Sequence, residues 1–351
     1  MFNKFLKVVN LVNEFLATPS NMKKMVLRGI RTTLLKLGSA TKVELSQRLE
    51  ISFPTISKFL TEMEKKGEVL LVGLDHSSGG RRAKRYSYNP EHMLGLVIFL
   101  EGTETNYIIL NCVGEIKEQG KAPSALIDNS LHFLTMTIEN IITKYPKISS
   151  MSIGVPAAVD NGKIIYIPGY EQFQNINLKE YYEENFSIPV IVENDMNAAV
   201  LGFHNNRGLK DKQSLVYLYS GQNGPGAGIM VNGDVVRGST FFSGEVSFVP
   251  QYDKRNFGQA LENRRGLKNL KISEDYEIDA ISRLVASFVA IINPHIIIFC
   301  KNEVENVILE KIRIASSNYI PSEHLPVLTT SDWKQDYLFG LQSLCLKLMI
   351  D

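Results

Sequence analysis

Three hydroxyl side chains and one lysine lie within residues 52–58, at a spacing that suits contact with the edges of DNA bases. Ser52 followed by Pro54 is typical of a helix start, because serine caps free N–H groups and proline has no N–H to satisfy. Apolar residues at helical spacing behind this start would face inward. A helix that enters the major groove contacts base edges with its N-terminal residues. The predicted base-contacting residues are Ser52, Pro54, Thr55, Ser57 and Lys58.

The flanking residues predict the elements that would position this helix. Residues 41–49 have a hydroxyl start and apolar residues at helical spacing, which predicts a short amphipathic helix before a tight connection. Gly67 is placed to end the second helix, and the segments 69–72 and 86–88 predict two short strands. Two helices followed by two strands indicate a winged helix-turn-helix over residues 41–85.

The connection between the two expected strands, residues 76–85, has paired glycines and four cations in its last five residues. Glycines let a backbone approach DNA closely, and arginines at such a tip can enter a narrow minor groove. A solvated hairpin is the alternative, since most basic loops are solvated. Behind a helix-turn-helix we expect DNA contact. The predicted contact residues of this tip are Gly79, Gly80, Arg81 and Arg82.

Charge is divided unevenly along the 351 residues, although the net charge is only +1. Residues 1–90 carry 16 Lys and Arg against 7 Asp and Glu, whereas the remainder carries 22 against 30. A basic module joined to an acidic body is typical of a DNA-binding regulator. No apolar run approaches the length that spans a bilayer, so no membrane association is expected.

Two further features indicate a cytoplasmic protein. Residues 2–16 leave an apolar stripe and lack a small-residue cleavage site, which favours an amphipathic helix over a signal peptide. Cys112, Cys300 and Cys345 are scattered and odd in number, so we expect reduced core cysteines. Without a pair of closely spaced cysteines we predict no zinc site and no cofactor.

Residues from about 93 onward predict an α/β body. Strand-length apolar runs occur at 94–100, 107–110, 150–155, 189–192 and 214–219. A helical pattern at 130–144 separates some of them, and such alternation is typical of α/β folds. Asn232-Gly233, between 227–231 and 234–237, predicts a hairpin with a type I′ turn. No internal repeat is evident.

Four motifs of this body carry a resemblance to a known family. They are Ile-Gly-Val-Pro-Ala-Ala-Val-Asp at 153–160, Val-Glu-Asn-Asp-Met-Asn-Ala-Ala-Val-Leu-Gly at 192–202, Ser-Gly-Gln-Asn-Gly-Pro-Gly-Ala-Gly-Ile at 220–229 and Gly-Glu-Val-Ser at 244–247. Together with the Ser-Gly-Gly-Arg-Arg tip at 78–82, they resemble the ROK family of repressors, open reading frames and kinases. The resemblance covers nearly the whole chain.

This resemblance implies an actin/hexokinase-like body of two lobes around a cleft. In the cleft, ROK kinases phosphorylate sugars. ROK regulators bind a sugar, a sugar phosphate or a partner protein, and this binding changes their affinity for DNA. The expected divisions are a DNA-binding domain at 1–90 with an extra N-terminal helix, a first lobe at 91–202, a second lobe at 203–332, and a C-terminal helix at 333–351 that returns to the first lobe.

The resemblance also assigns roles to cleft residues. Asp195 matches the family's catalytic base, and Asn194 and Glu245 match positions that hold sugar hydroxyls. Carboxylates and amides suit hydroxyls, which both donate and accept. The glycines at 221, 224, 226 and 228 match a phosphate loop, although turn geometry explains them as well. The alternative for Asp195 is a helix-start carboxylate beside exposed N–H groups.

Several departures from the family pattern argue against kinase activity. Phe99 stands where the family has the aspartate that organises metal and phosphates, and Phe248 stands where it has a histidine. Residues 251–256 replace the zinc loop, and 298–302 lack the glycine pair of the adenosine site. Losses at metal, zinc, sugar and nucleotide positions together predict that the chain is not an enzyme.

The sequence therefore predicts a ROK-like transcriptional regulator, more specifically a repressor of carbohydrate-metabolism genes. A homodimer or homotetramer would bind a two-fold symmetric operator in double-stranded DNA. A sugar or sugar derivative held by Asn194, Asp195 and Glu245 would change DNA affinity. The alternative is a regulator of the same fold without a small ligand, controlled by a partner protein; an active sugar kinase is more remote.

Overall fold

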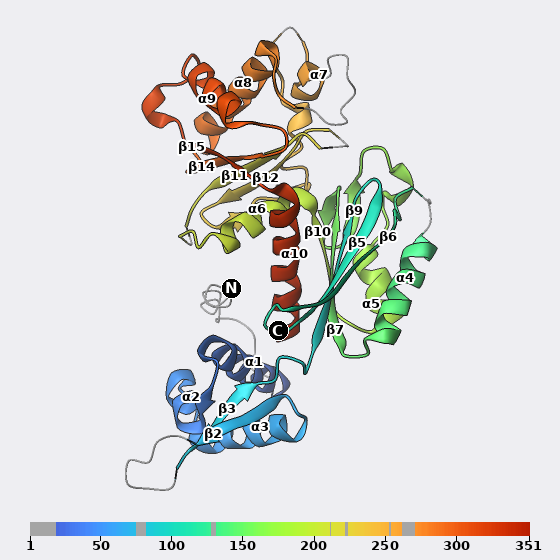
Figure 1. Cartoon of the computed structure of the whole chain (residues 1–351), viewed down its shortest axis with the longest axis vertical. Coiled ribbons are helices and arrows are strands. Elements are labelled where there is room, and N and C mark those ends of the chain that lie inside the picture. The colour runs from blue at the N-terminus through green and yellow to red at the C-terminus, as the bar shows by residue number, and fades with distance from the viewer. Residues whose placement is uncertain are drawn as a thin grey trace.

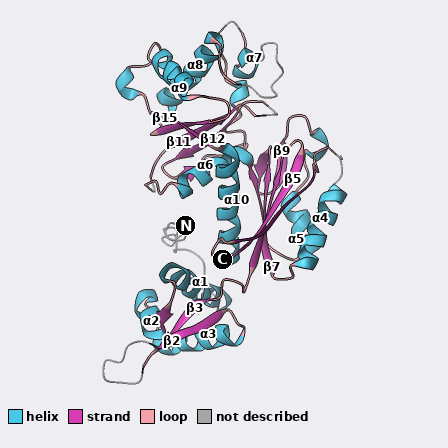
Figure 2. Ribbon diagram, in the orientation of Figure 1, coloured by secondary structure: helices cyan, strands magenta, loops and turns pink. Residues whose placement is uncertain are grey.

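The computed structural model describes most of the chain (Figure 1). The described residues are 19–74, 82–127, 131–210, 212–221, 224–252, 254–261 and 271–351. The helix expected at 2–16 lies outside them, as do Gly79, Gly80 and Arg81 of the predicted DNA-contacting tip. The described residues form four sheets and the helices that pack on them (Figure 2).

A small N-terminal unit contains three helices and a three-stranded antiparallel sheet of order β1-β3-β2. Its elements are α1 (Pro19–Leu37), β1 (Ala40–Thr41), α2 (Lys42–Leu49), α3 (Phe53–Lys65), β2 (Val69–Leu74) and β3 (Lys84–Tyr88). α2 begins at Lys42, one residue after the predicted start, and a capping box of Thr41 and Glu44 forms its N-terminus. Ile30 and Leu34 of α1 are fully buried with Leu45 and Ile56, so α1, a helix that no sequence pattern predicted, completes this core.

The first body sheet has five strands in the order β10-β7-β4-β5-β6. Its strands are β4 (Leu94–Leu100), β5 (Glu104–Asn111), β6 (Ile116–Pro123), β7 (Ile148–Val155) and β10 (Val190–Asn194). β4, β7 and β10 run parallel, and β5 and β6 add antiparallel pairs. Helices α4 (Leu131–Lys144) and α5 (Leu178–Phe186) pack on one face, and the hairpin β8 (Ala158–Asp160) and β9 (Lys163–Tyr166) lies beside it (Figure 1).

The second body sheet also has five strands, in the order β13-β12-β11-β14-β15. Its strands are β11 (Leu215–Tyr219), β12 (Gly226–Val231), β13 (Asp234–Val235), β14 (Ile296–Cys300) and β15 (Val327–Ser331). Three helices cover one face: α7 (Phe257–Leu261), α8 (Asp275–Ile291) and α9 (Asn306–Ser316). Asn232 and Gly233 have φ of +52° and +88°, as the predicted type I′ turn requires.

The two body sheets repeat one topology that the sequence did not reveal. In each, an antiparallel meander of three strands is followed by two strands parallel to the first. The repetition lies in strand order and direction, which depend on backbone hydrogen bonds between distant segments. Sequence similarity between the halves is therefore not needed to maintain it.

Two helices cross between the sheets: α6 (Asp195–Asn206) and α10 (Trp333–Ile350) (Figure 1). α10 packs on the first sheet, where the Ser152 hydroxyl donates to the Leu341 carbonyl at 3.0 Å. A Cβ on Gly202 of α6 would lie 1.8 Å from the Asp336 carbonyl oxygen, and one on Gly340 of α10 would lie 1.9 Å from that of Ala198. Glycine is therefore required at both positions, because the two backbones touch.

The end of α10 reaches the N-terminal unit, where Asp351 pairs with Arg28 of α1 at 2.7 Å. Cys112, Cys300 and Cys345 are buried and free of disulfides, as predicted. Within the described part of the chain, no helix combines the length and apolar character needed to cross a bilayer.

Candidate functional site

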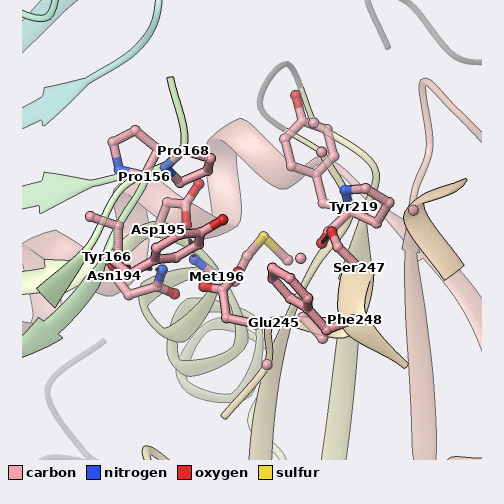
Figure 3. Close-up of a pocket in the computed structure, with 18 of the residues that line it drawn as sticks. Pro156, Tyr166, Pro168, Asn194, Asp195, Met196, Tyr219, Glu245, Ser247 and Phe248 are labelled. Carbon is pink, nitrogen blue, oxygen red and sulfur yellow. Dashed lines mark hydrogen bonds between the residues drawn. The ribbon is translucent and has the colours of Figure 1, made fainter. Parts of the chain in front are cut away.

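A cavity of about 300 Å³ lies between the two body sheets. Residues of the β10–α6 junction line one side, and residues of the glycine loop before β12, the segment 243–248 and the start of α10 line the other. Figure 3 shows Tyr166 and Asp195 on one side of the cavity and Tyr219 on the other, with Met196 between them. The three effector-binding residues predicted from the sequence, Asn194, Asp195 and Glu245, all line this cavity.

Asn194 is held by the fold. It is the N-cap of α6, and its side-chain oxygen accepts from the Asn197 N–H at 2.9 Å. Its amide nitrogen donates to the Ala157 carbonyl at 3.0 Å. Both polar atoms of the amide thus fix the junction between the first sheet and α6, and its contact with a ligand remains a prediction.

Asp195 and Glu245 are the two acidic groups of the predicted site. Asp195 begins α6, and its Oδ1 accepts from the Met196 N–H at 2.8 Å. Burial raises the pKa of Asp195 to about 7, and the neighbouring Glu245 adds to this shift while hydrogen bonds oppose it. Burial alone raises the pKa of Glu245 to about 7. Near neutral pH each group can therefore donate as an acid or accept as a carboxylate.

The glycines of the expected phosphate loop allow backbone conformations and close contacts that other residues would not. Gly221 and Gly224 have φ of +57° and +104°, which favour glycine. A Cβ on Gly228 would lie 2.0 Å from the Met196 carbonyl oxygen, so α6 leaves no room there. Turn geometry, the alternative stated from the sequence, accounts for Gly221 and Gly224, whereas close packing against α6 accounts for Gly228.

The Glu303 carboxylate accepts hydrogen bonds from the first N–H groups of this loop, a contact that the sequence did not predict. Its carboxylate accepts from the Ser220 N–H at 2.9 and 3.1 Å and from the Gly221 N–H at 3.2 Å. Burial raises the pKa of Glu303 to about 7, against the effect of these hydrogen bonds. Backbone N–H groups of this kind are the donors that bind phosphate in glycine-rich loops.

Aromatic side chains form two walls of the cavity and were also missed. Trp333, at the start of α10, stacks on Tyr219 with ring centroids 4.2 Å apart. Tyr166 of the β8–β9 hairpin lies 5.7 Å from Phe242 and 6.3 Å from Phe248, measured between centroids. Trp333 is the single tryptophan of the chain, which is the one signal that could have drawn attention to it.

Phe99, at the position where the family has a metal-binding aspartate, is buried in the protein core. Phe99 is 3% exposed and packs edge-on against Tyr337 with centroids 5.7 Å apart. The Lys334 ammonium lies 5.5 Å from the Phe99 centroid and pairs with Glu101 at 2.8 Å. Among the described residues no cluster of three or more His, Cys, Asp and Glu could hold a metal ion.

The predicted DNA-contacting residues of α3 lie at its exposed start. Ser52, Pro54 and Lys58 are exposed. Ser52 is the N-cap residue of α3, as predicted, but its hydroxyl makes no capping bond to a helix N–H and hydrogen-bonds the Thr55 hydroxyl at 2.8 Å instead. Ser57 accepts from the Lys42 ammonium at 2.9 Å, so α2 orients this hydroxyl.

The basic segment after β2 is described only from Arg82 onward. Arg82 and Lys84 are exposed. Arg85, in contrast, donates to the Glu44 carboxylate at 2.9 Å and to the Ser39 carbonyl at 3.1 Å. Arg85 thus anchors the sheet of the N-terminal unit to α2, which leaves Arg82 and Lys84 as the described cations on the surface here.

Two sheets of repeated topology, crossing helices and a cavity between them define an actin/hexokinase-like fold of mixed α/β content. Residues 97–257 match the model of the ROK family. A solved structure described as a ROK family transcriptional regulator, a homolog of the E. coli MLC protein, superposes with a TM-score of 0.70 at 17% identity. The superposition covers 94% of this chain and 97% of that one.

Curated relatives are named as repressors. The chain is 31% identical over 235 residues to the xylose repressor of Caldicellulosiruptor bescii, covering 64% of this chain and 57% of the relative. It is 23% identical over 220 residues to the N-acetylglucosamine repressor of Escherichia coli O157:H7, covering 60% and 54%. The chain thus spans little more than half the length of these relatives.

Proposed function

We propose that the chain is a transcriptional repressor of carbohydrate-metabolism genes whose DNA affinity is changed by a sugar or sugar derivative. The observation that carries this proposal is the union, in one chain, of an exposed helix start suited to base contact and a ROK body with a cavity. The names of the curated relatives support it.

The N-terminal unit acts as a winged helix-turn-helix in this proposal. α3 enters the major groove with Ser52, Pro54, Thr55, Ser57 and Lys58, and the segment that ends at Arg82 reaches the adjacent minor groove. A homodimer or homotetramer presents two such units to a two-fold symmetric operator. The domain limits at residues 90, 202 and 332 belong to the same proposal.

The cavity acts as a regulatory site without catalysis. Asp195 and Glu245 line it with acidic groups that can bind hydroxyls, while the Phe99 side chain is buried and has no oxygen for a metal. A ligand changes DNA affinity only as far as it prefers one arrangement of the two lobes over the other. Lobe closure would alter the spacing of the two DNA-binding units.

The proposal is tested by selecting bound fragments from sheared genomic DNA with the purified chain, then titrating the best fragment with sugars. We expect a symmetric site beside carbohydrate genes that one sugar releases. Asp195→Asn should abolish that release and leave DNA binding intact, with Asp279→Asn on α8 as the matched control. A symmetric site that no sugar disturbs would instead support control by a partner protein.

The absence of any selected fragment would contradict the DNA-binding part of the proposal. A phosphotransfer assay with the same sugars and a nucleoside triphosphate accompanies the titration. Turnover there would contradict the regulatory, non-catalytic role of the cavity.

A further inference from the structure

The charged side chains that line the cavity are all acidic among the described residues. Glu101, Asp195 and Glu245 line it, and no described lining residue is Lys, Arg or His. Lys334 pairs with Glu101 at 2.8 Å and with Glu104 at 3.2 Å, so its charge is already matched. Asp195 and Glu245 have no cationic partner among the described residues. An anion that enters the cavity would therefore meet like charge.

The backbone donors that could bind an anion are also taken. The Ser220 and Gly221 N–H groups point at the Glu303 carboxylate, with N–O distances of 2.9 to 3.2 Å. Glu303 occupies these donors as a phosphate group would in a glycine-rich loop. A phosphate could reach them only by displacing this carboxylate, and the two anions would repel each other.

The same groups suit a neutral polyol. Sugar hydroxyls can donate to carboxylates in charge-assisted hydrogen bonds, which are stronger than those between neutral groups. The stacked rings of Trp333 and Tyr219 provide a flat apolar wall. At about 300 Å³ the cavity is at the small end of ligand pockets, a size suited to a single sugar ring.

We propose that the cavity binds an unphosphorylated monosaccharide and rejects sugar phosphates and nucleotides, with Glu303 holding the loop donors closed to phosphate. The inference rests on the proposed function, because it specifies the ligand class of the same regulatory site. The selectivity arises in two ways: the carboxylates repel the phosphate group of a phosphorylated sugar, and the cavity contacts the free sugar favourably.

The test measures binding to the full chain by isothermal titration calorimetry at pH 7.5. The probes are xylose, glucose and N-acetylglucosamine, together with glucose 6-phosphate and N-acetylglucosamine 6-phosphate. We expect at least one free sugar to bind, and any 6-phosphate to bind at least 100-fold more weakly than the tightest free sugar. A 6-phosphate that binds as tightly as any free sugar would overturn the inference, and so would the failure of all three free sugars to bind.

A variant isolates the role of Glu303. Glu303→Gln removes one negative charge and should raise the affinity for the 6-phosphates at least tenfold. Glu323→Gln, an exposed carboxylate after α9, is the matched control and should leave it unchanged. Unchanged phosphate affinity in a folded Glu303→Gln would remove Glu303 from the explanation. If that variant does not fold, the unmodified chain still decides by its selectivity between free and phosphorylated sugars.

The outcomes for the cavity and for the proposed regulator are separable. DNA binding is measured on the same preparation with the selected genomic fragment. A chain that binds the fragment and releases it only with a sugar phosphate would retain the proposed function and refute this inference. A chain that binds free sugars but selects no DNA would support this inference and contradict the proposed function.

Discussion

Arg28 and Asp351 form an ion pair at 2.7 Å that joins α1 of the N-terminal unit to the end of α10. Both side chains are more than a third exposed, so the pair should contribute little to folding. Its position is more informative, because α10 begins at the cavity with Trp333 and ends at this contact. α10 therefore connects the cavity to the N-terminal unit.

We therefore expect Arg28→Ala to weaken the coupling between sugar and DNA more than it weakens folding. The free energy of unfolding should change by less than about 1 kcal/mol, as is usual for exposed pairs. The ratio of DNA affinities with and without sugar should fall severalfold in fluorescence anisotropy titrations. Arg313→Ala removes a similarly exposed pair with Glu310 on α9 and should leave the ratio unchanged.

Lys58 is expected to read base edges. Lys58→Ala should reduce affinity for the selected operator about tenfold or more, since one base contact contributes about 1–3 kcal/mol, and should relax preference at one position. Lys65→Ala, two turns further along α3, is the control and should have a small effect on all sequences alike. An equal loss by Lys58→Ala on every DNA tested would show that Lys58 contacts phosphate.

Arg82 is expected to contact the backbone or the minor groove without reading sequence. Arg82→Ala should weaken binding to all fragments and reduce the slope of log affinity against log salt by about 1, because one counterion fewer is released. Filter binding across a range of salt concentrations measures this slope. A slope equal to that of the unmodified chain would place Arg82 outside the interface.

The raised pKa values of Asp195 and Glu245 predict how stability depends on pH. Both are about 7 when folded, whereas the unfolded chain titrates these groups near about 4. Between these values the folded chain binds more protons, so its stability falls as pH rises from about 4 to 7 and then levels. Asp195→Asn with Glu245→Gln should shrink the fall in Tm between pH 5 and pH 8. An unaltered profile would show that neither carboxyl titrates in this window.

Gly202 is expected to be indispensable to the crossing of α6 and α10. A Cβ there would lie 1.8 Å from the Asp336 carbonyl oxygen, so Gly202→Ala must push two helices apart. We expect a loss of at least about 1–3 kcal/mol in the free energy of unfolding by urea. Gly73→Ala, where a Cβ would meet nothing within 4 Å, should change it by less than about 1 kcal/mol. Equal effects of the two substitutions would contradict the close crossing.

Local patterns in the sequence predicted most of the elements but not their arrangement. The run 94–100 forms β4 over the predicted residues, and the turn at Asn232-Gly233 has the predicted backbone. Burial and turn chemistry act over a few residues, so these features are visible in the chain. Strand order depends on pairings between distant segments, and the duplicated topology was accordingly missed.

The candidate site shows the same division. Asp195 and Glu245 were placed by resemblance to family motifs, and both line the cavity. The contact of Glu303 with Ser220 spans 83 residues, and no local motif marks it. The hydrogen bonds of Asn194 to Ala157 and Asn197 likewise follow from the folded junction. Sequence motifs therefore located the cavity, while its charge balance required the structure.

At Gly202 and Gly340 the backbones of α6 and α10 are in direct contact, and this contact could act as a pivot point. Gly340 lies near the middle of α10, whose 18 residues span roughly 27 Å. A helix that tilts about its midpoint moves its two ends in opposite directions. A tilt of α10 about this contact would therefore move Trp333, at the cavity, and Asp351, at the N-terminal unit, in opposite directions.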